Sequence, residues 1–462
     1  SRFARTRAGV TGRFFLGART RLDAAGAFLD MPFADSPGPL TRPEFDADPR
    51  QAAARYVATD AGKASRQVQA GAGLTHETAV GTLRVGGWGL TRSLENPLPF
   101  AYIRLDRRAG GASVQFGQAR PRFTWSIGAD AGTMHDDRRN FDNRQGAPGS
   151  QVLLDQQETV RNHAVFARLR LRQGRFGAHA ATRYDRLRFE ARDRLVTNGD
   201  ESGTRTFGAW SPSAGATLDL GGAATAFVNV STSFETPTTT ELTNRPDGAG
   251  GFNPALDPQH TRGGEAGVRG QHGAVAFDVA AYRYAVRGLI APFQTAAGGE
   301  RTFYRNEGES RHTGLEGALG WSLSDRTGAR MSYAYTRARF AGGPVDGRAV
   351  PAVPEHTVRA EMWHRIGPLR VAADLDAARG YPADDANTAH TDAYAALNLH
   401  AGAAFRTGDV YLTPFLSVRN LTDVRYTGAV TVNAAGGRFF EPAPGRVLHF
   451  GLQIGWGSGA DL

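Results

Sequence analysis

The most constraining feature of this sequence is an alternation of side-chain type with a period of two residues, clearest near the C-terminal end. In residues 446–456, RVLHFGLQIGW, large apolar side chains occupy every second position from Leu448 to Trp456, and the positions between them are mostly small or polar. Successive side chains of a β-strand point to opposite faces, so this segment predicts a strand with one apolar face and one mostly polar face.

The same alternation recurs along the chain in segments of about ten residues, the length of a tilted transmembrane β-strand. In residues 161–172, for example, Val165 and Leu169 share one face, and Arg168 and Arg170 share the other. No apolar run approaches the ~20 residues that a transmembrane helix needs. We therefore predict an all-β fold, a transmembrane antiparallel β-barrel with its apolar faces towards lipid and its small or polar faces towards a lumen. About nineteen strands are visible, a number within the range of such barrels.

Connections between the predicted strands alternate between short turns and long segments rich in Pro, Asp and Asn. The long segments lie at residues 31–63, 93–110, 135–156, 191–204, 237–260, 293–308, 341–353, 381–390 and 424–445. Outer-membrane barrels have short periplasmic turns and long extracellular loops, so we expect these segments outside the cell. The alternative is a soluble all-β array such as a propeller, but its repeats of about 40–50 residues are not seen here.

The charge balance narrows the possible partners. The formal net charge is +9, carried almost wholly by Arg. Neither a basic helix nor a zinc-finger or RNP-type spacing is present, so we do not expect a nucleic-acid partner. Arg dispersed along strands suits a lumen wall and bonds to lipid phosphate. The chain has no Cys, which removes disulfides and thiolate metal sites.

Two motifs stand out from the strand pattern. The first, within residues 231–270, is a Phe-x-x-Pro-x-x-x-Glu-Leu run, a long loop with Asn-Pro-x-Leu-x-Pro, and a strand opening with Glu-x-Gly. Its residues are Phe234, Pro237, Glu241, Leu242, Asn253, Pro254, Leu256, Pro258, Glu265 and Gly267. The second, near the C-terminal end, joins Asn-Leu-Thr-Asp, a Tyr, and Arg-Phe-Phe-x-Pro-x-x-Gly-Arg to a strand that ends in an aromatic residue. Its residues are Asn420, Leu421, Thr422, Asp423, Tyr426, Arg438, Phe439, Phe440, Pro442, Gly445, Arg446 and Trp456. Together they resemble the corresponding segments of TonB-dependent outer-membrane receptors.

This resemblance implies a barrel of about 22 strands whose lumen is plugged by an N-terminal domain that contacts TonB, the energy coupler of the inner membrane. No plug-like segment precedes Phe3. We therefore expect residues 1–462 to be the barrel domain alone, with the plug and some three first strands absent from this chain. The chain also departs from the family pattern after Trp456, where the family usually ends.

The resemblance further implies a location in the outer membrane of a Gram-negative-type cell and TonB-dependent uptake of a scarce ligand, most often a ferric siderophore. The expected partners are outer-membrane lipid, that ligand, and TonB through the plug. A passive pore, or a surface enzyme or adhesin built on a barrel, is the alternative. No spacing assembles a Ser/His/Asp triad, and the Gly-rich stretches do not open a helix as a phosphate-binding loop would. We nominate no catalytic residue, cofactor or metal ligand and expect no enzyme activity.

Ligand-binding residues are hypothesised in the segment that starts at His135, which is dense in charge. We nominate His135, Arg138, Arg139 and Phe141. The carboxylates nearby could hold a metal ion, but solvated loop charge is the favoured interpretation. Arg-rich walls favour an anionic ligand such as a ferric chelate.

Two further sets of residues receive structural interpretations. For Arg438, Phe439 and Phe440 we favour an aromatic girdle at the membrane interface over a ligand contact. The strand histidines are expected at polar positions of the wall; they are His163, His179, His400 and His449.

Overall fold

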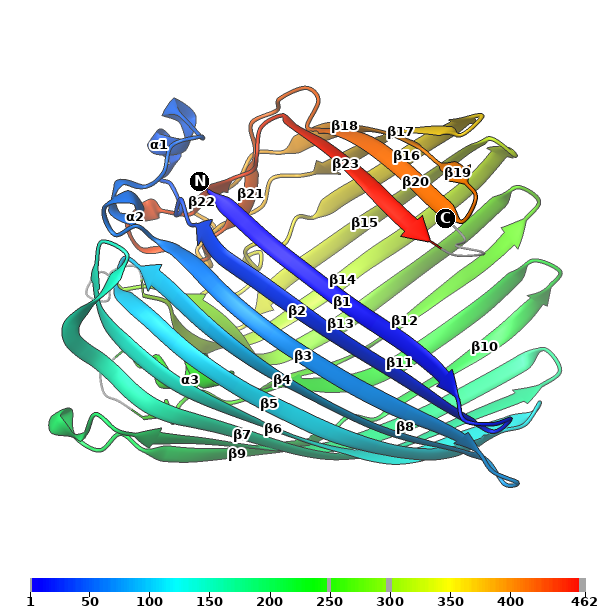
Figure 1. Cartoon of the computed structure of the whole chain (residues 1–462), viewed down its shortest axis with the longest axis horizontal. Helices are drawn as coiled ribbons and strands as arrows, with labels where there is room; N and C mark the ends of the chain where they lie inside the picture. Colours follow the sequence, from blue (N-terminus) through cyan, green and yellow to red (C-terminus); the bar gives the residue numbers. More distant parts are fainter. Residues whose placement is uncertain (1, 247–250, 296–300, 457–462) are drawn as a thin grey trace.

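One antiparallel sheet of 21 strands accounts for most of the chain and curves into a barrel with strongly tilted strands (Figure 1). The structure is a computed structural model and describes residues 2–246, 251–295 and 301–456. The first half of the sheet consists of β1 (Phe3–Phe15), β2 (Thr20–Asp35), β3 (Gly62–Glu77), β4 (Thr82–Leu98), β5 (Ala101–Ala119), β6 (Phe123–Arg144), β7 (Ala147–Gln173), β8 (Phe176–Asp193), β9 (Gly203–Trp210), β10 (Ser213–Gly221) and β11 (Ala224–Glu235). The second half consists of β12 (Gln259–His272), β13 (Val275–Phe293), β14 (Phe303–Ser324), β15 (Thr327–Ala341), β16 (His356–Ile366), β17 (Leu369–Ala378), β18 (Tyr394–Ala403), β19 (Phe405–Thr407), β20 (Val410–Arg419) and β23 (Val447–Trp456).

The remaining elements are short and lie at one end of the barrel. They are the helices α1 (Arg42–Ala47), α2 (Ala54–Ala58) and α3 (Thr239–Thr243), the 3₁₀ turns η1 (Val196–Asn198) and η2 (Ala435–Gly437), and the hairpin of β21 (Thr427–Val430) and β22 (Phe440–Pro442). We call this end the loop end and the opposite end, where turns such as residues 78–81 join the strands, the turn end. No helix within the described residues is long and apolar enough to cross a membrane.

The 21 strands occupy nineteen positions, because two of them continue a neighbour after a short break. β9 and β10 both pair with β8 and are separated by Ser211 and Pro212, and proline cannot donate a ladder hydrogen bond. β18 and β19 both pair with β20. Subtracting these two breaks from 21 leaves nineteen, which confirms the number of strands predicted from the sequence.

Two of the nineteen positions, the first and the last, have a ladder on one side only. β1 pairs with β2 and β23 pairs with β20, and no ladder between β1 and β23 is present among the described residues. Every neighbouring pair is antiparallel, so the strands at the first and nineteenth positions must run in the same direction. Figure 1 shows them doing so, in blue and in red.

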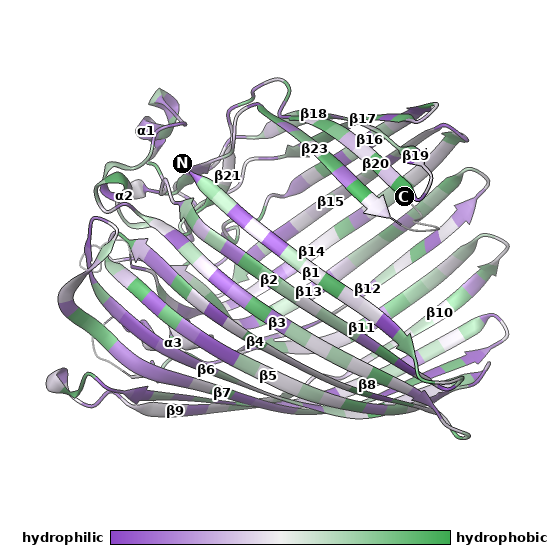
Figure 2. Cartoon of the chain, in the orientation of Figure 1, coloured by the Kyte–Doolittle hydropathy of each residue, from purple (hydrophilic) through white to green (hydrophobic). Residues whose placement is uncertain are grey.

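The two faces of the strands differ as the sequence predicted. On β7, Val165, Leu169 and Leu171 are exposed on the outer face. On β23, Phe450 is 81% exposed, and Leu448 and the other apolar side chains at every second position lie on that outer face. Green and purple therefore alternate along many strands in Figure 2. Large apolar side chains in such numbers on the outside of a curved sheet are the pattern of a lipid-facing surface.

Two of the predicted long loops are wrong. β4 continues to Leu98 and β5 starts at Ala101, inside the segment 93–110. β6 and β7 extend through the segment 135–156 and meet at a two-residue turn, in which Gln145 and Gly146 have positive φ. These strands continue beyond the apolar zone, held by backbone bonds and by charge pairs such as Arg139 Nε–Asp155 Oδ2 at 2.9 Å. Their polar sequence therefore looked like a loop.

The described parts of the segment 237–260, up to the start of β12, and the segment 424–445 connect strands of the barrel, as predicted. Small apolar cores hold the loop end together. Leu40 and Phe440 form one core and exchange backbone hydrogen bonds, which joins the β2–β3 loop to the β20–β23 loop. Phe440 is only 2% exposed. The prediction that residues 438–440 form a membrane girdle is therefore wrong, because Phe440 packs between two loops.

Candidate functional site

The four nominated ligand residues all lie on β6, and strand alternation separates them. Arg138 points inward and is buried, whereas His135 and Arg139 lie on the opposite, outward face. His135 faces Thr159 across the strand pair, with Nδ1 and Oγ1 3.0 Å apart. Phe141 is also at an odd-numbered position, on the same face of β6 as His135 and Arg139, and its ring contacts the guanidinium of Arg104. Only Arg138 of the four thus faces the interior of the barrel.

Helix α3 brings the β11–β12 loop against this inner wall. The Thr238 hydroxyl accepts from Glu241 N while the Glu241 carboxylate accepts from Thr238 N, which is the capping-box arrangement. Leu242, just after it, is completely buried against Phe189 of β8 and Phe207 of β9. The helix is short, so this apolar anchor rather than helix propensity fixes its place.

Two ion pairs are buried below this loop. Arg107 of β5 donates to Asp136 of β6 through both Nε and Nη2, at 2.7 and 2.6 Å. Arg138 Nε lies 2.9 Å from Glu158 Oε1 of β7, without the alignment of a hydrogen bond. Both carboxylates have no exposed surface. Arg138 also donates through Nη2 to Thr240 of α3 at 2.7 Å, so the wall and the loop share one polar network.

Two more arginines adjoin this network without a carboxylate partner among the described residues. Arg92 of β4 lies opposite Arg107 in the ladder, and its buried Nε has no hydrogen-bond partner there. Arg301 donates through Nη2 to the side-chain oxygen of Asn244 at 2.8 Å. Burial, and then the positive charge of Arg138, lower the pKa of Arg301. We call Arg92, Arg107, Arg138 and Arg301, with Asp136 and Glu158, the arginine cluster.

The arginine cluster has more positive than negative charge. Four guanidinium groups face two carboxylates, and a guanidinium stays charged under all ordinary conditions. Removing such charge from water is costly unless it is paired. The shortage of carboxylates therefore favours an anion that arrives from outside the described residues, and the planar forks of Arg match carboxylate and phosphate oxygens.

The sequence motifs have structural roles at the loop end. The side chain of Asn420, which has positive φ, bonds with the backbone of Val424, and Asp423 accepts from Arg446 N at 2.7 Å. Tyr426 stacks on Tyr394 with ring centroids 4.1 Å apart. Arg438 donates to both carboxylate oxygens of Glu44 on α1.

The first motif is likewise structural. Leu256 packs in the same apolar core as Leu242, and Pro237 is completely buried. A Cβ at Gly267 would come within 2.4 Å of a backbone oxygen of the neighbouring strand, so only glycine fits there. Arg205 donates to the carbonyls of Asn253 and Pro254 and closes the loop onto the wall.

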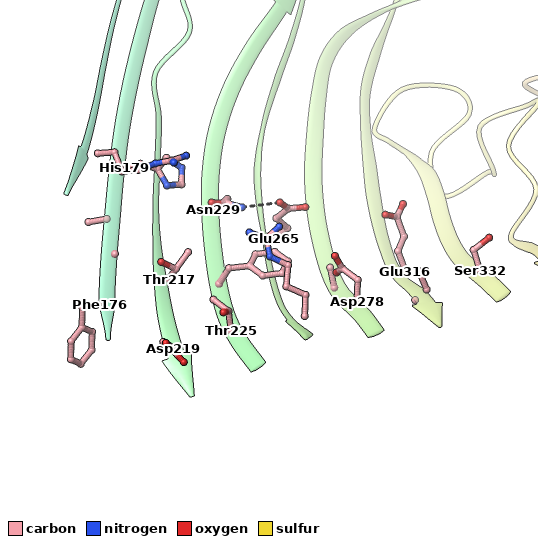
Figure 3. Close-up of a pocket in the computed structure, with 18 of the residues that line it drawn as sticks. Phe176, His179, Thr217, Asp219, Thr225, Asn229, Glu265, Asp278, Glu316 and Ser332 are labelled. Atoms are coloured by element: carbon pink, nitrogen blue, oxygen red, sulfur yellow. Dashed lines mark hydrogen bonds between the residues drawn. The ribbon is translucent and has the colours of Figure 1, made fainter. Parts of the chain in front are cut away.

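A second polar region lines the inner wall near the turn end, where a hollow of about 880 Å³ opens. Side chains from successive strands point into it in Figure 3; they include His179, Asn229, Glu265, Asp278, Glu316 and Ser332. Asn229 Nδ2 donates to Glu265 Oε1 at 2.9 Å. The hollow thus offers both charges and hydrogen-bonding groups to whatever occupies the lumen. His179 confirms the predicted wall position for this histidine, whereas the prediction for His163 is wrong, because alternation places it on the outer face beside Val165.

Within the ranges that the structure describes, no three or more His, Asp or Glu side chains are grouped as metal ligands would be.

Comparison with known proteins identifies a family. A family model described as the β-barrel of TonB-dependent receptor-like proteins matches residues 7–421. Among solved structures, the ferric citrate transporter FecA in its unliganded form superposes with a TM-score of 0.77 at 17% identity, covering 97% of this chain and 70% of that one. The ferric yersiniabactin uptake receptor FyuA from Yersinia pestis gives 0.75 at 14% identity, with 97% and 70% covered.

The copper transporter OprC gives a TM-score of 0.75 at 16% identity, covering 98% of this chain and 72% of that chain. At these identities the likeness to solved structures shows the fold. The family is shown by the family model, which spans most of the chain.

Proposed function

This chain belongs to the TonB-dependent receptor family, and we propose that it forms the barrel of an outer-membrane receptor that takes up a negatively charged metal chelate of the ferric siderophore class. The family and the structural neighbours are transport receptors rather than enzymes. By the family's orientation, the loop end faces the outside of the cell and the turn end the periplasm.

The observation that carries the proposed ligand class is the charge of the arginine cluster. It lies at the loop end, on the inner side of the barrel, where an incoming ligand is first enclosed. Arg301 adjoins Arg138 without a carboxylate of its own among the described residues. A metal complex with free carboxylates or other anionic oxygens would supply the missing negative charge and accept charge-assisted hydrogen bonds.

Of the residues nominated from the sequence, Arg138 remains in this proposal, together with Arg92 and Arg301, which the sequence had not suggested. His135, Arg139 and Phe141 lie on the outward face, so we assign them no contact with a ligand inside the lumen. They were nominated because they lie close to Arg138 in the sequence, but successive side chains of a strand point to opposite faces.

Coupling to TonB would require a plug, and two observations support one. The hollow at the turn end presents unfilled polar groups to the lumen, as a wall that binds another domain would. A barrel of this size is also too wide for its own side chains to fill, and barrels of about 22 strands are plugged. We therefore propose that a plug domain outside these residues occupies the hollow.

The proposed ligand class is tested by binding to the complete native receptor, purified in neutral detergent, with ferric citrate as the probe. We expect saturable binding that weakens between 50 and 200 mM salt. Arg301→Gln should weaken it about 10-fold or more, because a hydrogen bond to a charged group contributes about 1.5–3 kcal/mol. Arg192→Gln, an exposed outward-facing arginine on β8, is the matched control and should leave affinity unchanged. Affinity that is insensitive both to salt and to Arg301→Gln would contradict an anionic ligand.

The alternatives are separated by an uptake measurement. Accumulation of ⁵⁵Fe from ferric citrate should require the receptor and should stop in cells that lack TonB. Accumulation that continues without TonB would favour a passive pore. If copper(II) binds and ferric citrate does not, the proposed ferric ligand is wrong, and a copper ligand is favoured instead.

A further inference from the structure

Beyond the ligand, we propose that the outer face of β5–β8 binds the phosphate groups of lipid headgroups in the outer leaflet of the membrane. The proposed site consists of Arg108, Arg161, Arg186 and Arg188, with His135 and His163 between them, and we call it the outward arginine patch. The argument concerns the outside of the barrel and does not depend on what passes through the lumen.

The ladder places these residues next to one another. Arg161 of β7 lies directly opposite Arg188 of β8, and His163 lies opposite Arg186. Arg108 of β5 lies opposite His135 of β6. Neighbouring strands are about 4.8 Å apart, so these basic side chains extend from a continuous area across four strands.

Alternation shows that this area faces outward. Arg161 and His163 have the same parity on β7 as Val165, Leu169 and Leu171, which form the exposed apolar face of that strand. All members of the patch are themselves exposed. They do not belong to the arginine cluster, whose strand residues lie on the inner face.

The height of the patch matches that of a headgroup layer. Arg161 is ten residues beyond Leu171, the last apolar outward side chain near the turn end. At about 3.3 Å per residue and a tilt near 45°, this corresponds to about 23 Å of height, close to the ~25 Å apolar band of such barrels.

Aromatic residues mark the edges of the same band. Phe116 and Trp125 contact each other near the turn end. The rings of Tyr184 and Trp210 are in contact, with centroids 5.0 Å apart. Tyr184 lies two residues before Arg186 on β8, so the two are neighbours on the outward face. Tyr and Trp gather at the two interfaces of a membrane. The arginines therefore lie just beyond the hydrocarbon, where lipid phosphates are found.

The arginines of the patch also have few ion-pair partners in the protein. Arg108, Arg161 and Arg186 have no ion pair among the described residues, and the contact of Arg188 with Glu190 is long, at 3.8 Å. Like charges directly opposite each other in a sheet are destabilising, and Arg161 and Arg188 stand in that relation. A phosphate between them would remove the repulsion and accept two guanidinium forks.

The test is lipid binding to the complete receptor in neutral detergent, measured by native mass spectrometry. The probes are a lipid carrying two phosphates on a glucosamine disaccharide, the same lipid without phosphates, and inorganic phosphate. We expect retention of the phosphorylated lipid, loss of binding when its phosphates are removed, and no displacement by millimolar inorganic phosphate. Equal retention of both lipids, or displacement by inorganic phosphate, would overturn the proposal.

Variants locate the site. Arg161→Gln combined with Arg188→Gln should weaken binding of the phosphorylated lipid about 25-fold, because each basic side chain at an anionic membrane surface strengthens binding about fivefold. Arg168→Gln, on the inner face of the same strand, is the matched control and should leave binding unchanged. If the control weakens binding as much as the double variant does, the attraction is to overall charge and the patch is not a site. Binding by the unmodified receptor must also weaken with salt, a measurement that does not depend on variant folding.

Discussion

At the scale of the residue, adjacent aspartates on β6 experience opposite environments. Asp136 is completely buried and forms a two-point ion pair with Arg107. Asp137, the next residue, faces outward, is 56% exposed and contacts Arg194 at 2.6 Å. Two carboxylates that look alike in the sequence should therefore contribute very differently to stability.

Replacing each aspartate with asparagine tests this difference. Asp136→Asn leaves Arg107 without its partner at a buried site, and we expect a loss of about 3 kcal/mol in the free energy of unfolding. Asp137→Asn removes an exposed pair and should cost less than about 1 kcal/mol. Urea unfolding of the receptor in lipid bilayers, followed by tryptophan fluorescence, measures both. Equal effects of the two substitutions would show that Asp136 is hydrated in the native state.

At the scale of the element, the β6–β7 hairpin shows what sequence alone could and could not predict. Alternation located the strands wherever one face meets lipid, because there the two faces must differ in polarity. Beyond the lipid both faces meet polar surroundings and the signal disappears, so the segment 135–156 is predicted as a loop. The left-handed Gln145–Gly146 turn is the remaining local signal, since Gly favours positive φ in tight hairpins.

The arginine cluster was harder to predict for a related reason. Strand pairing brings together its members on β4, β5, β6 and β7. Arg301 comes from the β13–β14 connection and lies close enough to Arg138 to feel its positive charge. Arg138 was identified because charge is dense in its segment. Arg92 and Arg301 lie in stretches with no such density. They matter because no carboxylate among the described residues pairs with them, and that can be seen only in the three-dimensional structure.

The connection between α1 and the β20–β23 loop gives a second prediction at this scale. Arg438 donates to both oxygens of Glu44, at 3.0 and 2.8 Å. The Thr41 backbone N–H and then Arg438 lower the pKa of Glu44. A carboxyl whose pKa is lowered by folding stabilises the folded arrangement above its unfolded pKa of about 4.3, and this stabilisation is lost as the pH falls through the lower, folded-state pKa.

We therefore expect Arg438→Gln to speed amide exchange in α1 at pH 7, and acidification below about pH 4 to have the same effect in the unmodified receptor. Arg55→Gln is the control, because Arg55 is exposed on α2 and has no ion pair among the described residues. Hydrogen–deuterium exchange with mass spectrometry, corrected for intrinsic rates, measures both. Unchanged exchange in α1 after Arg438→Gln would mean that the Leu40–Phe440 core alone holds the loops.

At the scale of the whole molecule, the direction of the strands limits how the sheet can close. β1 and β23 run in the same direction (Figure 1). Closing the sheet with antiparallel ladders alone therefore requires an odd number of additional strands between them. Three would give the 22 of plugged outer-membrane transporters. An open edge is also untenable in lipid, where every backbone group needs a partner. We propose that strands outside residues 1–462 fill this position.

Disulfide trapping tests this closure, and no cysteine within residues 1–462 competes with the introduced pairs. Val10 of β1 lies opposite Gly26 of β2, and opposite residues have Cα atoms about 4.5–5.5 Å apart, so Val10→Cys with Gly26→Cys should oxidise readily. Three intervening strands would place β1 and β23 about 19 Å apart. Val10→Cys combined in turn with Leu448→Cys, Phe450→Cys or Leu452→Cys should then remain reduced in the complete receptor purified from outer membranes. A disulfide in any of these three pairs would mean that β1 and β23 meet directly in a parallel ladder, as an odd-stranded barrel requires, and the proposal of additional strands would fail.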